Sequence, residues 1–221
     1  QAFYLWLFLI TDLGLLYSSE RLVRIELMPN ESFNWVSNPL IPIAGSRLSD
    51  FMSQVLPRLP AVLKDLELPR LIHFYCLSIT SECAELKFIL ASLFMEALKF
   101  YWALNVGKKL PIYKKNGFIK GFEKSKNKNN DSVPFEFKEL LDEAYRSYGL
   151  NPNFTFIENR NAMFHSGAPG TYQQGVSSPW QTIKPELITL YRQIDDVLLA
   201  ILGYTGVIHR WDTPDIIDSY P

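Results

Sequence analysis

The sequence is poor in the residues that build metal and disulfide sites. Its 221 residues include only two cysteines and three histidines, His73, His165 and His209. No Cys-x-x-Cys or His-Glu-x-x-His spacing occurs. Cys76 and Cys83 lie in a segment predicted to be one helix, which would separate them by about 10 Å along its axis, too far for a disulfide. We therefore expect no metal, no cofactor and two reduced, buried cysteines, with His73 and His209 structural.

Long hydrophobic runs are also scarce. Residues 3–10, FYLWLFLI, are densely apolar, but Asp12 follows and the run is too short to span a bilayer. It also lacks the basic start and small-residue cleavage site of a secretory signal. We expect no membrane association and a cytoplasmic location.

Charge is balanced overall and uneven locally. The net charge is −1, whereas residues 107–131 carry eight lysines against Glu123 and Asp131. Asn and Lys dominate this stretch, so we predict a long basic loop with a short helix over 107–134.

The first part of the chain differs from the rest. Residues 3–10 and 21–28 are typical of strands, and prolines between 29 and 45 indicate irregular structure. Because the first residue is Gln rather than Met, we expect a cut inside a longer polypeptide. Residues 1–45 then form a β-rich N-terminal segment, for which the tail of a preceding domain is one interpretation.

Residues 46–221 are predicted to form a helical domain. The stretch 70–106 contains no Gly or Pro, and its apolar residues recur at helical spacing. A loop is expected over 168–181 and an irregular tail after Gly203. Further helices are predicted at 49–56, 61–68, 135–148, 154–166 and 184–202. The fold class is therefore mostly α, a bundle of four to five helices with a small β-rich N-terminal piece.

One stretch, FIENRNAMFHSG, carries a chemically distinctive pattern. On a helix Asn161 and His165 are four positions apart and share a face, and the long Arg160 side chain reaches the same area. An imidazole exchanges protons near neutral pH. A guanidinium neutralises charge on phosphoryl oxygens. Together they suit cleavage of RNA, which supplies its own 2′-hydroxyl nucleophile. One imidazole is poorly placed to be both base and acid, so a second copy from a partner subunit is expected.

The same residues resemble the HEPN superfamily, whose helical bundles carry an Arg-[Asn/His/Asp]-x-x-x-His pattern on a late helix. Arg160, Asn161 and His165 match it position by position. The stretch FILASLFMEALKFYW is similar to the central helix of that family, with Glu96 as its acidic residue. The order of the later helices also fits, closest to the ApeA-like domains of larger bacterial proteins. The similarity covers about residues 48–210.

The resemblance implies a metal-independent endoribonuclease in antiphage defence or a toxin system, acting as a homodimer through the Arg160/His165 helix face. Its catalytic residues would be Arg160, Asn161 and His165. The alternative is a non-catalytic HEPN module that binds RNA, a nucleotide or a protein partner. Glu96 and Glu158 are candidate supporting residues of the site, and Glu96 either orients Arg160 or simply faces water. In a purely structural interpretation, Arg160 pairs with Glu158, and His165 is placed near the unpaired carbonyls of its helix end.

The lysine-rich stretch gives the RNA-binding candidates, Lys108, Lys109, Lys114 and Lys115. These cations either contact phosphates or belong to a solvated loop. Three aromatic residues are interleaved with them and either stack on bases or anchor the loop, namely Tyr113, Phe118 and Phe122.

Overall fold

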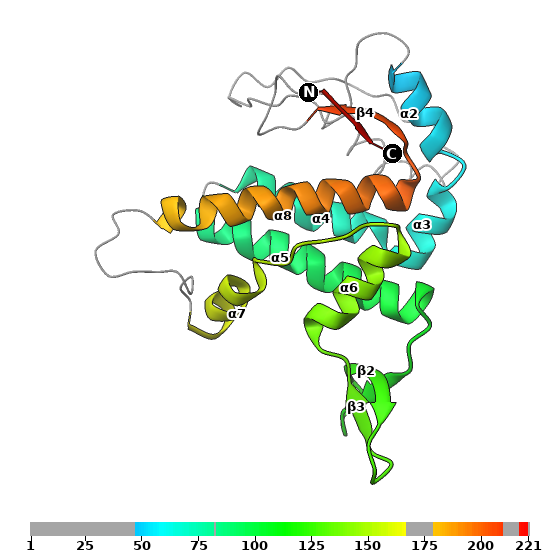
Figure 1. The fold of residues 1–221 in the computed structure, drawn as a ribbon, viewed down its shortest axis with the longest axis vertical. Helices are drawn as coiled ribbons and strands as arrows, with labels where there is room; N and C mark the ends of the chain where they lie inside the picture. The colour runs from blue at the N-terminus through cyan, green and yellow to red at the C-terminus, as the bar shows by residue number, and fades with distance from the viewer. Residues whose placement is uncertain (1–46, 82, 167–178, 210–216, 221) are drawn as a thin grey trace. The chain divides into compact units, whose positions relative to one another are not determined.

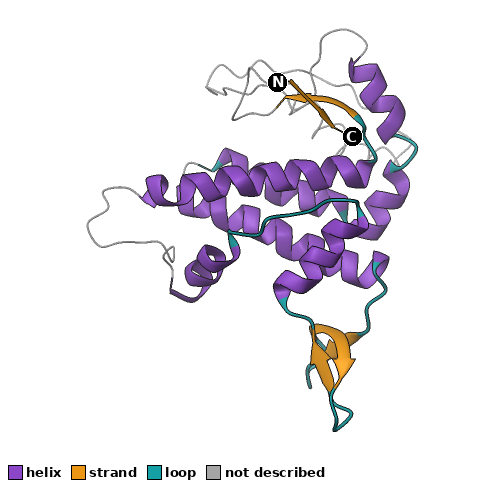
Figure 2. Ribbon diagram, in the orientation of Figure 1, coloured by secondary structure: helices purple, strands orange, loops and turns teal. Residues whose placement is uncertain are grey.

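A computed structural model describes residues 47–81, 83–166, 179–209 and 217–220 of the chain (Figure 1). The described part is mostly helical, as predicted, with small antiparallel sheets (Figure 2). The chain divides into two compact units, one comprising residues 64–201 and the other residues 1–63 and 202–221. The two strands predicted at 3–10 and 21–28 lie outside the described residues.

The larger unit is built on a helical hairpin, where a single long helix had been predicted. Helix α4 (Leu68–Thr80) and helix α5 (Ala84–Tyr101) are separate and pack against each other. The prediction of one helix over 70–106 is therefore wrong. Ser81 and Cys83 adopt extended backbone angles, and Lys87 Nζ donates to the Ile79 carbonyl across the turn at 2.8 Å.

Folding back buries apolar side chains that one long helix would expose. Phe88, Phe94, Met95 and Leu98 of α5 are all fully buried. Cys76 therefore lies in α4 and Cys83 immediately precedes α5, with free thiols in both cases. Cys83 is exposed and Cys76 half-buried, so the expectation of two buried cysteines is wrong.

Helix α5 ends in a π-helical turn, η1 (Trp102–Val106), closed at Gly107 as the sequence predicts. The Gly107 N–H donates to the Trp102 carbonyl at 2.7 Å. A Cβ on Gly107 would lie 2.9 Å from the Trp102 ring, which explains the need for glycine there. Ala84–Val106 is the one described helical stretch long and apolar enough to cross a membrane, although a helix packed inside a bundle meets the same test.

Three further helices complete this unit: α6 (Phe137–Ser147), α7 (Ile157–Ser166) and α8 (Pro179–Leu202), the last of which reaches the unit boundary. Helix α6 begins with a capping box between Glu136 and Glu139, close to its predicted start. Helix α8 starts earlier than predicted, and Pro185 lies inside it rather than at its first turn.

Buried polar groups link α4 to α8. The Tyr75 hydroxyl donates to Asp195 Oδ1, and the Tyr191 hydroxyl donates to the Ser78 carbonyl at 3.0 Å. Burial raises the pKa of Tyr75, and Asp195 raises it further. Hydrogen-bonded polar pairs of this kind fix how two apolar helices align, because an unpaired polar group in a core is costly.

The lysine-rich segment is a sheet, so the prediction of a long loop with a short helix is wrong. Strands β1 (Pro111–Tyr113), β2 (Ile119–Lys126) and β3 (Ser132–Pro134) pair antiparallel in that order. Gly117 supplies a positive φ of 83° in the first turn, and Asn130 a φ of 65° in the second. Phe122 is buried and packs edge-on against Phe100 of α5, which fastens the sheet to the helices.

The smaller unit contains α2 (Arg47–Val55) and the first part of α3 (Leu59–Leu66). Its C-terminal part forms a pair of strands, β4 (Gly206–His209) and β5 (Ile217–Tyr220), where an irregular tail had been predicted. Phe51 of α2 packs edge-on against Tyr204 with ring centres 5.2 Å apart. Pairing of the two strands satisfies backbone groups that a structureless tail would leave to solvent.

Candidate active site

Helix α7 carries the Arg-Asn-x-x-x-His pattern and has two distinct faces. Phe156, just before its first residue, is buried, as are Asn159 and Met163. The opposite side is exposed and contains four residues at helical spacing: Glu158, Asn161, Phe164 and His165. The predicted side-by-side placement of Asn161 and His165 follows from this helix, since residues four apart share a face.

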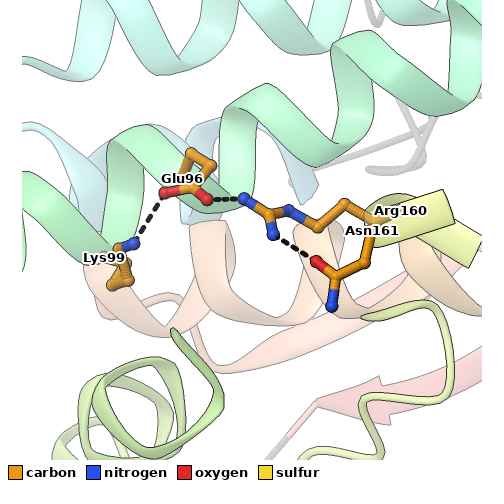
Figure 3. A network of polar contacts seen from close by, with 4 residues as sticks. All are labelled: Glu96, Lys99, Arg160 and Asn161. Atoms are coloured by element: carbon orange, nitrogen blue, oxygen red, sulfur yellow. Dashed lines mark hydrogen bonds and ion pairs between the residues drawn. The ribbon is translucent and has the colours of Figure 1, made fainter. Parts of the chain in front are cut away.

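Arg160 lies between these two faces and is held on several sides. Its side chain is only 16% exposed, and its Nη2 forms an ion pair with Glu96 Oε1 of α5. Its Nη1 donates to Asn161 Oδ1 at 2.6 Å (Figure 3). The guanidinium carbon also lies 4.3 Å from the ring centre of Phe137 and 5.2 Å from that of Phe164, within cation–π range.

Glu96 is shared by two cations. Its second oxygen, Oε2, lies 2.6 Å from Lys99 Nζ, one turn further along α5 (Figure 3). Lys99 Nζ also lies 4.6 Å from the ring centre of Phe137, so this one ring contacts both cations. Glu96, Lys99, Arg160 and Phe137 therefore form one cluster, which we call the Glu96 cluster.

Burial changes the proton affinity of both cations in the Glu96 cluster. It lowers the pKa of Lys99 to about 8, even though a carboxylate lies beside it. It also lowers the pKa of Arg160, whose guanidinium nevertheless stays protonated at physiological pH. The cluster carries a net positive charge of about one when Lys99 is protonated, which favours an anion nearby.

The guanidinium keeps hydrogen-bonding capacity. It has five N–H donors, of which Glu96 and Asn161 each take one. Arg160 Nε is buried and has no hydrogen-bond partner among the described residues. Each terminal nitrogen retains one further N–H, which is what a bidentate contact with a phosphate requires.

His165 occupies the last turn of α7 and is exposed. It forms no hydrogen bond or ion pair with any described residue of the chain. Its ring is therefore unrestrained by protein partners in the described chain and reachable from solvent, as a group that exchanges protons with a substrate must be.

The structure brings together Arg160, Asn161 and Glu96, and it adds two residues that the sequence did not suggest, Lys99 and Phe137. The Glu96–Lys99 spacing of three residues is a helix-face signal that could have pointed to Lys99. Phe137 carries no local signal, because its role depends on how α6 packs. Glu158 is exposed and forms no ion pair with another described residue.

The four RNA-binding candidates do not join the Glu96 cluster. Lys109 pairs with Glu143 at 2.5 Å and lies 4.8 Å from the ring centre of Phe135, so it is already engaged. Lys108, Lys114 and Lys115 are exposed. They lie on the segment that forms β1 and its turns.

Within the described ranges, no group of three or more His, Cys, Asp or Glu side chains is arranged to hold a metal. Comparison with family models, curated proteins and solved structures finds no match to this chain.

Proposed function

We propose that this chain is a HEPN-type helical domain that cleaves RNA without a metal, with Arg160, Asn161 and His165 as its catalytic residues. The observation that carries the proposal is the anchored guanidinium. Arg160 is fixed by Glu96 and Asn161 next to an exposed helix face that also carries His165. The resemblance of the motif to HEPN domains points the same way.

The chemistry follows from these groups. The His165 imidazole takes the proton of the RNA 2′-hydroxyl, and that oxygen attacks the adjacent phosphorus. Arg160 donates to the phosphoryl oxygens as their negative charge increases. The bond to the 5′-oxygen breaks, and the leaving oxygen takes a proton from a second imidazole. The products are a 2′,3′-cyclic phosphate and a 5′-hydroxyl.

The second imidazole is proposed to be His165 of another copy. The α7 face suits such a contact, because Phe164 is 45% exposed beside His165. Burying that ring against a second copy would remove apolar surface from water and place two imidazoles near one phosphate. We place this homodimer in the cytoplasm, in a defence or toxin role.

The test is cleavage of end-labelled RNA in EDTA by the wild type and by His165→Ala. His73→Ala is the matched control, since His73 is also an exposed histidine, on α4. We expect the wild type and His73→Ala to cleave and His165→Ala to lose activity by about a hundredfold or more, the usual contribution of a general base. Equal cleavage by all three proteins would remove His165 from the reaction.

The second candidate is a non-catalytic HEPN module that binds RNA, a nucleotide or a protein partner. The observation that favours it is the engagement of Arg160, which is mostly buried and already paired. Under this alternative, RNA binding survives His165→Ala and weakens with salt, while no preparation cleaves RNA in EDTA.

A further inference from the structure

The β1–β2 hairpin exposes aromatic rings that the helices do not use. Phe118 is 70% exposed and Tyr113 is 60% exposed, whereas Phe122 at the base of the hairpin is buried. Neither exposed ring contacts another aromatic ring of the described chain. Large rings left in water on a two-stranded tip gain free energy when another flat apolar surface covers them.

The charges around these rings have one sign. Residues 110–122 contain Lys114, Lys115 and Lys120 and no Asp or Glu. All three lysines are exposed and form no ion pair with other described residues. Glu123 lies further along β2, where it accepts a hydrogen bond from the Ser132 hydroxyl. Two glutamates of α6 pair with lysines of this segment, Glu139 with Lys124 and Glu143 with Lys109.

The tip is a defined structure rather than a loose loop. The Lys114 N–H donates to the Phe118 carbonyl at 2.7 Å, and the Gly117 N–H donates to the Lys114 carbonyl at 2.9 Å. The Asn116 side chain accepts from the Phe118 N–H at 3.3 Å. A fixed turn presents rings and cations at a reduced entropic cost of binding.

From these observations we infer that the β1–β2 hairpin, residues 111–126, binds single-stranded nucleic acid. Exposed bases stack on Phe118 and Tyr113, and Lys114, Lys115 and Lys120 contact phosphates. Duplexes fit poorly, because paired bases already stack on one another and hide their faces. The choice of RNA as the strand rests on the proposed function, whereas binding itself does not require cleavage.

The base of the sheet adjoins the Glu96 cluster. Phe137, the ring beneath Arg160, follows the last residue of β3, Pro134, by three positions, a span of about 10 Å at most. The Phe135 N–H also donates to the Phe122 carbonyl of β2 at 2.9 Å. The hairpin proposed to bind nucleic acid is thus joined by a short segment to α6, whose Phe137 contacts Arg160.

The test measures binding of labelled twelve-nucleotide U-RNA, T-DNA and a duplex RNA by anisotropy across a salt series. All proteins carry His165→Ala so that cleavage does not interfere. We expect the RNA single strand to bind more tightly than the duplex. Phe118→Leu, which keeps an apolar side chain but loses the ring face, should weaken binding of the single-stranded RNA about tenfold. It should leave the slope of log affinity against log salt unchanged. Phe118→Trp restores the affinity.

Substitution of the lysines should change the salt dependence of binding. Lys114→Ala with Lys115→Ala lowers the slope of log affinity against log salt by about 1.4, or about 0.7 for each phosphate of a single strand that is no longer neutralised. The matched control is Lys64→Ala with Lys138→Ala, two exposed lysines on α3 and α6, which leaves the slope unchanged.

Two results would overturn the inference: no loss of affinity in Phe118→Leu, or duplex binding as tight as single-strand binding. Binding of the DNA but not the RNA would overturn the choice of RNA as the strand. Failure of this inference and failure of the proposed function give different results. Cleavage by the wild type with no hairpin effect rejects only the hairpin, and hairpin binding without any cleavage rejects only the nuclease.

Discussion

The substitution Glu96→Gln tests the Glu96 cluster most sharply. It keeps the shape and one acceptor oxygen of the side chain but removes the negative charge that pairs with both Lys99 and Arg160. Two cations then face each other beside Phe137, each largely shielded from water, with side-chain exposures of 17% and 16%. Stability must fall, because an uncompensated charge is left in a partly dry environment.

The expected loss of stability in Glu96→Gln is the difference between opposing free-energy contributions. One charge pair about 4 Å apart is worth about 4 kcal/mol at the effective dielectric of a protein surface. The retained Gln hydrogen bond offsets part of that loss, as does release of the Lys99 proton. We expect a net destabilisation of about 2 kcal/mol, or a fall in Tm of about 4–8 °C for a chain of this size.

Urea unfolding followed by circular dichroism measures this change, and Glu139→Gln is the matched control. Glu139 also pairs with a lysine, Lys124, but at an exposed site, and Gln preserves its capping-box role. The control should therefore stay close to wild type. The cost of Glu96→Gln should also shrink as pH rises through about 8, where Lys99 loses its proton. Equal effects of the two substitutions would refute the reasoning.

Three further predictions concern single residues. Because burial lowers the pKa of Lys99 to about 8, below its unfolded value of 10.5, the unfolded chain binds the extra proton and stability rises with pH across that window. Lys99→Met should abolish that rise in urea titrations at pH 7.5 and 10, and an unchanged rise would contradict the assignment. Phe137→Leu should cost about 1 kcal/mol because the cation–π attraction to Arg160 and Lys99 disappears, measured by thermal unfolding, and the cost should vanish in an Arg160→Met, Lys99→Met background. Gly117→Ala should cost about 1 kcal/mol because its φ is 83°. Gly121→Ala should be nearly neutral by the same measurement, because the added Cβ would lie in ordinary contact with Pro134 Cβ at 3.7 Å.

The helical class was predictable because its signals are local. Helix α6 has a capping box at Glu136 and Glu139 and is closed after Ser147 by Gly149, where φ is 77°. Helix α7 was placed from the Asn-Pro-Asn start and the following Gly, although it begins at Ile157, three residues later than expected. Amphipathic helices with such ends are specified by neighbours in sequence.

The break between α4 and α5 was missed because its local signal is weak. Neither Gly nor Pro occurs between Arg70 and Val106, and the polar run at the turn, Thr80-Ser81-Glu82, is only three residues long. A single helix there would be about 55 Å long and would expose apolar side chains on several sides. Folding back buries them, which is a property of the whole segment and not of its periodicity.

The lysine-rich sheet was mistaken for a loop because its polar composition outweighed its turn signals. Asn116–Gly117 is a strong hairpin dipeptide, and Phe122 alone supplies the buried anchor. For the candidate site, the motif on α7 and the acidic Glu96 were found from sequence. Lys99 and Phe137 were not, because only the packing of α5 and α6 brings them to Arg160.

The origin of the nucleophile is the central claim of the proposed reaction. The decisive measurement compares cleavage in EDTA of an RNA oligonucleotide with that of the same oligonucleotide carrying a 2′-deoxy sugar at the cut position, with the new ends identified by mass. The proposed reaction predicts a 2′,3′-cyclic phosphate and a 5′-hydroxyl from the first and no cut at the modified position in the second. Cleavage of both, or products that end in a 5′-phosphate, would contradict it.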